Sequence, residues 1–225
     1  MDKHEVSERY KGEEGKKYAK VKHDDGYHVG YELNFEYFEP YIGRESRVLD
    51  FGCGNGGMLN IIRRNVEVAH GVEVNEHSAK VARSNGMKVY GSIGDLPDEN
   101  EYDVIVSNHV LEHVRNPPGT IEGLKDYIRS GGMLCLKVPI EDWRAKDQKS
   151  WEGGDINHHL QTWTPKLMGN TLCEAGYSVE EIKTVTSAWH KKLFPLVGTG
   201  MGKFAFWALA VLKKRRQLFA VGRVD

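Results

Sequence analysis

The stretch Val48–Gly57, with the sequence VLDFGCGNGG, decides how this chain folds. Two apolar residues lead to an acid, Asp50, and four glycines then occupy the six positions from Gly52 to Gly57. This order predicts a buried strand, a tight turn and the start of a helix. Because glycine carries no Cβ, a ligand can lie directly against the main chain of the turn. The helix that follows presents free N–H groups to that ligand.

Two classes of cofactor that contain a nucleoside fit such a turn, namely dinucleotides and cofactors with a cationic amino group. Gly52, Gly54 and Gly57 match the GxGxxG pattern that holds the pyrophosphate of a dinucleotide. Asp50, by contrast, favours a ligand with a cationic amino group at the end of the first strand. Glu73 closes the second predicted strand, where a carboxylate can accept hydrogen bonds from both hydroxyls of a ribose. These residues predict a ligand that contains a nucleoside and leave both cofactor classes open.

A regular alternation of strands and helices surrounds this turn. Predicted strands occupy residues 47–51, 66–72, 87–90, 102–107 and 132–138, and predicted helices occupy residues 57–64, 77–85 and 118–129. A predicted helix over 165–175 and predicted strands over 179–186 and 204–212 follow. This pattern predicts an α/β fold with a doubly wound, mostly parallel seven-stranded sheet and an antiparallel C-terminal hairpin. Ligands bind such sheets at the carboxyl ends of the strands.

Three segments resemble one known family. They are DFGCGNG at 50–56, SNHVLEHV at 107–114 and HHLQTWTPKLMGNTLCEAGYSV at 158–179. Together they resemble the class I S-adenosylmethionine-dependent methyltransferases. The LEHV segment is similar to that of ubiquinone, sugar and natural-product O-methyltransferases. The resemblance covers residues 47–186, and several motifs in order at predicted strand ends favour methyl transfer over hydride transfer.

The resemblance implies a Rossmann-like methyltransferase fold with S-adenosyl-L-methionine as the cofactor. The residues that it places around this cofactor are Asp50, Gly52, Cys53, Gly54, Asn55, Glu73, Val74, Ser92, Ile93 and Asn108. The family often has an acid directly after the glycine that follows the third strand, whereas this chain has Ser92 there. Ile93 is expected to cover the adenine ring.

Methyl transfer to an alcohol or phenol needs a base that removes the hydroxyl proton. Histidine suits that role near neutral pH, and we expect the base to be one of His109, His158 and His159. The resemblance then implies O-methylation of a small-molecule, sugar or lipid-linked acceptor. An NAD(P)-dependent oxidoreductase and a non-catalytic module that binds S-adenosylmethionine are the alternatives.

One competing interpretation involves a metal ion. The segment HVLEH at 109–113 fits the HxxEH pattern of zinc proteases, in which two histidines share one face of a helix. The glycine turn and the alternating strands point away from a protease. We therefore expect no metal in the site, with a divalent ion held by Glu112 or the histidines as the alternative.

The composition of the chain indicates its number of domains, its kinds of partner and its compartment. The chain has 225 residues and a formal net charge of −1, which fits one domain and does not indicate a nucleic-acid partner. Its three cysteines are odd in number and widely spaced, which favours a reducing, cytoplasmic compartment. The highly charged N-terminus does not resemble a signal peptide, and no apolar run is long enough to span a membrane.

The chain divides into three predicted parts. Residues 1–31 are expected to form an N-terminal arm or lid, and residues 32–212 the methyltransferase domain, with 139–163 as a substrate-side insertion. Residues 213–225 are expected to form a basic tail because four bases stand together at 213–216. Such a cluster suits an anionic membrane surface or a phosphorylated acceptor, and the simpler interpretation is a solvated strand end.

Overall fold

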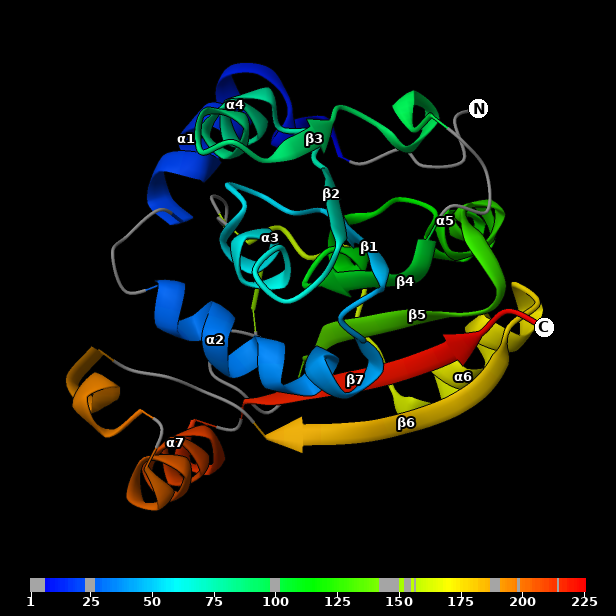
Figure 1. The fold of residues 1–225 in the computed structure, drawn as a ribbon. Helices are drawn as coiled ribbons and strands as arrows, with labels where there is room; N and C mark the ends of the chain where they lie inside the picture. Colours follow the sequence, from blue (N-terminus) through cyan, green and yellow to red (C-terminus); the bar gives the residue numbers. More distant parts are fainter. Residues whose placement is uncertain are drawn as a thin grey trace.

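The structure, a computed structural model, describes residues 7–22, 27–97, 102–141, 150–151, 155, 157–186, 191–197, 199–213 and 215–225. Its centre is a seven-stranded sheet with the strand order β3-β2-β1-β4-β5-β7-β6 (Figure 1). The strands are β1 (Arg47–Phe51), β2 (Val68–Val72), β3 (Lys88–Tyr90), β4 (Tyr102–Asn108), β5 (Ile128–Ile140), β6 (Ser178–Thr186) and β7 (Arg216–Arg223). β1 to β5 are parallel, and β7 is antiparallel to both of its neighbours. The predicted α/β sheet with an antiparallel C-terminal hairpin is confirmed.

Helices cover both faces of the sheet. Successive strand residues point to opposite sides, so the apolar residues of the central strands need a covering layer on each face. Val104 and Val106 of β4 face a core cluster with α2 (Tyr27–Phe38) and α3 (Gly57–Ile62). Ile105, between them, faces a second cluster with α5 (Pro117–Leu124) and α6 (Pro165–Glu174). α4 (Glu76–Ser84) packs beside α3 through a third cluster. Burial on both faces explains why the central strands are continuous apolar runs.

Side-chain caps set the starts of three helices. Asn75, Asn116 and Thr164 precede α4, α5 and α6, and each accepts a hydrogen bond from the backbone N–H three residues later, at 3.1–3.2 Å. α5 and α6 also have proline at the first helical position. These residues satisfy N–H groups that a helix start leaves free. The predicted helices therefore begin within a few residues of the observed ones.

The predicted strand over 204–212 is wrong, because this apolar run belongs to the helix α7 (Gly200–Leu212). A short apolar run has no period that separates a buried strand from a helix, and its three alanines are strong helix formers. Thr199 begins the helix by accepting a hydrogen bond from the Gly202 N–H at 3.0 Å. α7 lies beyond the C-terminal end of β6 and the start of β7 (Figure 1). No helix in the described part of the chain is long and apolar enough to cross a bilayer.

The predicted basic tail at 213–225 is wrong for its larger part, because Arg216–Arg223 form β7. This strand lies between β5 and β6, where Leu218, Phe219 and Val221 are fully buried. The C-terminal hairpin thus has its second strand later in the chain than the sequence predicts. The apolar residues that follow the basic cluster explain the difference, since a sheet interior needs them.

The N-terminal arm is folded in its described part. It contains the short helix η1 (Glu8–Tyr10) and the helix α1 (Gly12–Lys22), which lies beside α4 (Figure 1). The packing is close, because a Cβ on Gly15 would lie 2.2 Å from the Tyr10 carbonyl oxygen and 2.7 Å from the Asn75 side chain. The arm is therefore seated against the segment between β2 and α4.

We predict that Gly52→Ala destabilises the protein more than Gly131→Ala. Both glycines have a left-handed backbone, with φ of 79° and 76°, so alanine costs about 1–2 kcal/mol at either position. At Gly52 the new Cβ would also lie 2.3 Å from Val110 Cγ2, whereas nothing lies within 4 Å at Gly131. Urea unfolding should show a further loss of about 1–3 kcal/mol for Gly52→Ala. Equal losses in the two variants would contradict close packing of the turn.

Candidate active site

A cavity of about 380 Å³ lies at the carboxyl ends of β1, β2 and β4. Its walls come from the glycine turn, the loop after β2, the end of β4, the N-terminal arm and the start of β7. A volume of this order suits a small ligand. This edge is also where a parallel sheet is expected to bind its ligand.

Asp50 and Glu73 line this cavity together, although they belong to different strand ends. Asp50 is 2% exposed, and its Oδ2 has no hydrogen-bond partner among the described residues. Burial, with the nearby charge of Glu73, raises the pKa of Asp50 to about 7 against a hydrogen bond from the Leu59 backbone. Glu73 accepts hydrogen bonds from the N–H groups of Gly54 at 2.8 Å and Asn75 at 2.7 Å, and burial raises its pKa too. Two buried acids at one cavity favour a cationic, hydroxyl-bearing ligand.

Most of the residues predicted to hold the cofactor line the cavity. They are Asp50, Gly52, Cys53, Gly54, Asn55, Glu73, Val74 and Asn108. Ser92 and Ile93 do not line it. Ser92 is exposed and donates its hydroxyl to Asp95 at 2.9 Å, and Ile93 is buried in the core. Their contact with an adenine ring stays a prediction.

The segment after β4 is not the helix that a zinc protease requires. The His109 N–H donates to the Lys137 carbonyl oxygen at 2.8 Å, which extends the contact between β4 and β5. His109 has a left-handed backbone, with φ of 58°, and only the short helix η4 (Leu111–His113) follows. The two histidines of the HxxEH pattern therefore do not share one helix face, and the protease interpretation is wrong.

Glu112 is fully buried and connects the groups around it. Its Oε1 accepts a hydrogen bond from His109 Nδ1 at 3.2 Å and lies 3.9 Å from His113 Nε2. Its backbone carbonyl accepts hydrogen bonds from the N–H groups of Leu160 at 2.7 Å and Gln161 at 3.3 Å. Burial alone would raise the pKa of Glu112, but the hydrogen bond from His109 and the charges of His109 and His113 hold that pKa below its usual value.

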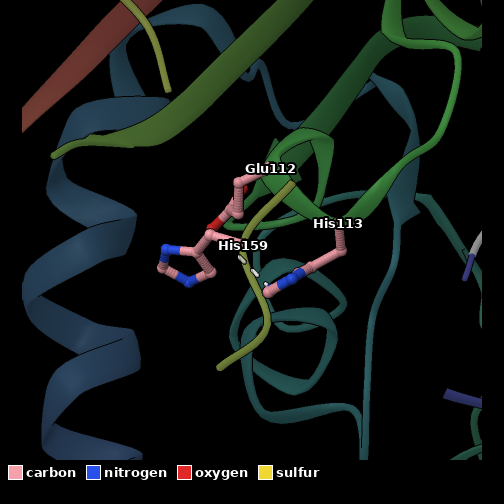
Figure 2. A group of neighbouring side chains, drawn as sticks. All are labelled: Glu112, His113 and His159. Atoms are coloured by element: carbon pink, nitrogen blue, oxygen red, sulfur yellow. Dashed lines mark ion pairs between the residues drawn. The ribbon is translucent and has the colours of Figure 1, made fainter. Parts of the chain in front are cut away.

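His113 and His159 lie beside Glu112, with their ring centroids 5.0 Å apart (Figure 2). His113 Nδ1 is 2.7 Å from the Tyr10 hydroxyl, and His159 Nδ1 is hydrogen-bonded to the Glu141 carboxylate. Burial lowers the pKa of His113 to about 4, so its imidazole is neutral at pH 7. Burial would also lower the pKa of His159, but the hydrogen bond with Glu141 raises it.

The structure brings two of the three predicted bases to the cavity. His109 and His159 line it, and His158 does not. His158 has a left-handed backbone, with φ of 48°, and its Nδ1 lies 3.4 Å from the Arg9 guanidinium group. Which of these histidines acts as a base stays a prediction.

Several cavity residues lie outside the cofactor motifs of the sequence. Tyr10 and Tyr18 come from the arm, Asn34 comes from α2, and Arg215 and Gln217 come from the start of β7. Only tertiary folding brings these segments together. Glu112 and His113 are different, because they belong to the LEHV segment, which resembles a motif of the family.

A family model described as a methyltransferase domain matches residues 27–182, which is well over half of the chain. The chain belongs to the class I S-adenosylmethionine-dependent methyltransferases. This result confirms the predicted family and its cofactor, S-adenosylmethionine. It also favours methyl transfer over the alternative of a dinucleotide-dependent oxidoreductase.

Similarities to known proteins support the assignment of this chain to the methyltransferase family. An uncharacterised protein of Methanocaldococcus jannaschii is 31% identical over 192 residues, which cover 81% of this chain and 89% of the relative. A ubiquinone biosynthesis O-methyltransferase of Shewanella sp. (strain ANA-3) is 30% identical over 101 residues, 41% of this chain and only 43% of that relative. The crystal structure of an S-adenosylmethionine-dependent methyltransferase from Mesorhizobium loti shares the fold, with a TM-score of 0.62 at 16% identity over 87% of this chain and 97% of the other.

The described residues fit the methyl donor. Asp50 offers a buried, unpartnered oxygen to a cationic amino group. Glu73 keeps a lone pair for a ribose hydroxyl, because a carboxylate has about four acceptor positions and the backbone N–H groups of Gly54, Val74 and Asn75 occupy only part of them. A Cβ at Gly54 would meet nothing within 4 Å, so the glycine turn borders open space in which a ligand can lie.

We predict that Asp50→Asn stabilises the ligand-free methyltransferase increasingly as the pH rises from 4 to 7. The pKa of Asp50 is about 7 in the folded protein and about 4 in the unfolded chain. The stability that comes with the raised pKa is present below pH 4 and is lost as the pH rises through 7. In urea unfolding, the advantage of the variant should grow by up to about 4 kcal/mol and then level off.

The control for this experiment is Glu67→Gln, which changes an exposed acid and should show no such trend. An advantage of Asp50→Asn that does not change with pH would contradict the buried acid. We also expect the same variant to bind S-adenosylhomocysteine roughly tenfold more weakly by calorimetry, because it removes the charge that we expect to face the amino group.

Proposed function

We propose that this protein transfers the methyl group of S-adenosylmethionine to an oxygen atom of a small-molecule, sugar or lipid-linked acceptor. The observation that carries the proposal is one cavity that contains both the Asp50–Glu73 corner and His109, paired with buried Glu112. A histidine–carboxylate pair is suited to remove the proton of a hydroxyl, the step that O-methylation needs. The Shewanella relative is an O-methyltransferase, which supports oxygen as the methylated atom.

His109 is the residue that we assign as the base. Its Nδ1–H donates to Glu112, so the neutral ring has its lone pair on Nε2. Glu112 fixes this tautomer and stabilises the imidazolium that forms when Nε2 takes the hydroxyl proton. S-Adenosylmethionine, when bound, supplies a sulfonium methyl group with a neutral leaving group. Positioning of the acceptor opposite the sulfur then supplies much of the rate.

The acceptor side of the cavity combines aromatic rings with a cation. Tyr10 and Tyr18, whose ring centroids lie 4.9 Å apart in an edge arrangement, come from the arm and help to exclude water. Arg215 and Gln217 reach the same cavity from the start of β7. This lining favours an acceptor that joins an apolar or aromatic part to an anionic group, such as a phosphate.

We predict that calorimetry shows binding of S-adenosylhomocysteine in preference to NADH, and that His109→Gln loses turnover. Methyl transfer from radiolabelled donor to a panel of phenols, sugars and phosphorylated lipids should fall by about 10²–10⁴-fold, because the variant lacks the base. Affinity for S-adenosylhomocysteine should stay unchanged, because His109 acts on the acceptor.

The matched control is His77→Gln on α4, outside the cavity, which should keep full turnover. Preference for NADH would contradict the proposed function. Binding of S-adenosylhomocysteine without turnover on any acceptor, and with no effect of His109→Gln, would favour a non-catalytic binding module.

We also propose that α7 contacts an anionic lipid surface. Its large apolar side chains Met201, Phe204, Trp207, Val211 and Leu212 are each 49–82% exposed. No acid occurs between Glu181 and Asp225, whereas this interval contains nine lysines and arginines. An apolar face flanked by bases is typical of a helix that lies in a membrane interface. Contact of this kind would bring the cavity close to a lipid-linked acceptor.

We predict that the protein sediments with phosphatidylcholine vesicles that contain phosphatidylserine, and that the double variant Phe204→Ser/Trp207→Ser does so several-fold less. The reason is loss of apolar area at the interface, about 25 cal/mol for each Å². Val179→Ser, at an exposed apolar residue of β6, is the control. Equal sedimentation of wild type and double variant would contradict the assignment of α7.

A further inference from the structure

Three side chains meet at one side of the cavity and offer the ligand set of a transition-metal site. One ligand atom each of Glu112, His113 and His159 lies within 4.8 Å of the other two. Glu112 and His113 come from η4, and His159 comes from the segment that leads into α6 (Figure 2). We propose that Glu112, His113 and His159 together bind a divalent first-row transition ion, such as Zn²⁺, beside the acceptor oxygen.

The contact between His113 and Tyr10 decides which nitrogen of the His113 ring carries the lone pair that an ion needs. The Tyr10 hydroxyl donates its single proton to the Asn157 carbonyl oxygen at 2.6 Å. His113 Nδ1 must therefore be the donor in its 2.7 Å contact with the same hydroxyl. In the neutral ring the lone pair then lies on Nε2, the atom 3.9 Å from Glu112 Oε1.

His159 is prepared in the same way by a carboxylate. Its Nδ1 is hydrogen-bonded to Glu141, which is half-buried, so Nε2 is left for the ion. Metal-binding histidines in proteins almost always give their second ring N–H to a carboxylate, a carbonyl or a similar acceptor. That bond fixes the ring and increases the basicity of the ligand nitrogen. Both histidines of this group have such a partner, although the partners come from different segments.

Glu112 supplies an independent sign of an absent cation. The side chain is fully buried, and its Oε2 has no hydrogen-bond partner among the described residues. A buried carboxylate oxygen without a partner is costly, because it has left water and gained nothing in return. A bound cation would satisfy that oxygen, while Oε1 keeps its hydrogen bond from His109.

The chemistry of the donor set selects the kind of ion. Two imidazole nitrogens and one carboxylate suit Zn²⁺ and its first-row neighbours, whereas Mg²⁺ prefers oxygen ligands throughout. All three residues line the cavity, so the remaining coordination position opens towards the acceptor. An ion there would lower the pKa of a coordinated hydroxyl, whose proton passes to His109. This role rests on the proposed function, whereas metal binding itself does not.

The test is a titration of untagged, chelator-treated protein with Co²⁺, followed by visible absorption. We expect one equivalent to bind and Zn²⁺ to displace it. His113→Ala and His159→Ala should each weaken Co²⁺ binding by about a hundredfold or abolish it, and Glu141→Gln should weaken it by about tenfold. His77→Ala is the control, because His77 lies on α4 outside the cavity. Thermal unfolding should show that each variant is folded.

Two results would overturn the proposal. One is the absence of saturable Co²⁺ binding, and the other is binding that His113→Ala and His159→Ala leave unchanged. Failure of the proposed function has a different signature, since Co²⁺ binding is measured with neither donor nor acceptor present. Stoichiometric Co²⁺ binding without any methyl transfer would contradict the proposed function alone. Full methyl transfer by chelator-treated protein that binds no Co²⁺ would contradict the metal site alone.

Discussion

The burial of one carboxylate, Glu112, holds together the part of the cavity that we propose as the acceptor side. An acid that is removed from water needs partners, and Glu112 finds them in several segments. Its side chain takes a hydrogen bond from His109, and its backbone carbonyl takes the amides of Leu160 and Gln161. These backbone bonds fix the segment before α6, which places His159 beside Glu112. The catalytic geometry that we propose therefore depends on the same contacts that close the fold at this point.

The side of the cavity proposed for the cofactor follows a different constraint, which is the burial of two acids next to each other. Asp50 and Glu73 face one cavity, and burial raises the pKa of both. Keeping both acids buried lowers the stability of the ligand-free protein, and we expect a cationic methyl donor to offset that loss when it binds. The glycine turn makes the arrangement possible, because Gly54 leaves open space where any other residue would place a Cβ. At this corner, the acids that we expect to bind the ligand therefore lower the stability of the ligand-free fold.

The last strand joins the two ends of the chain at the cavity. β7 lies between β5 and β6, so the residues just before and within its start, Arg215 and Gln217, reach the site. The N-terminal arm reaches it from the other side, through the bond between Tyr10 and His113, residues 103 positions apart. α7 directly precedes β7 and therefore lies next to the start of that strand (Figure 1). The acceptor side is therefore built almost entirely from segments outside the central strands.

The sequence by itself determined the alternating strands and helices, the glycine turn, and the pairing of Asp50 with Glu73 at neighbouring strand ends. These features depend on short patterns, such as a period of two or of 3.6 residues and the lack of a Cβ, that act within a few positions. Only the tertiary structure decided that 204–212 is a helix, that 216–223 is a strand inside the sheet, and that Ser92 and Ile93 are not among the residues that line the cavity. It also decided that His159 lies beside Glu112 and that Tyr10 contacts His113. One reason is that a short apolar run is compatible with either a helix or a strand. The other is that contacts between residues about a hundred positions apart follow from packing and burial, which no local sequence pattern encodes.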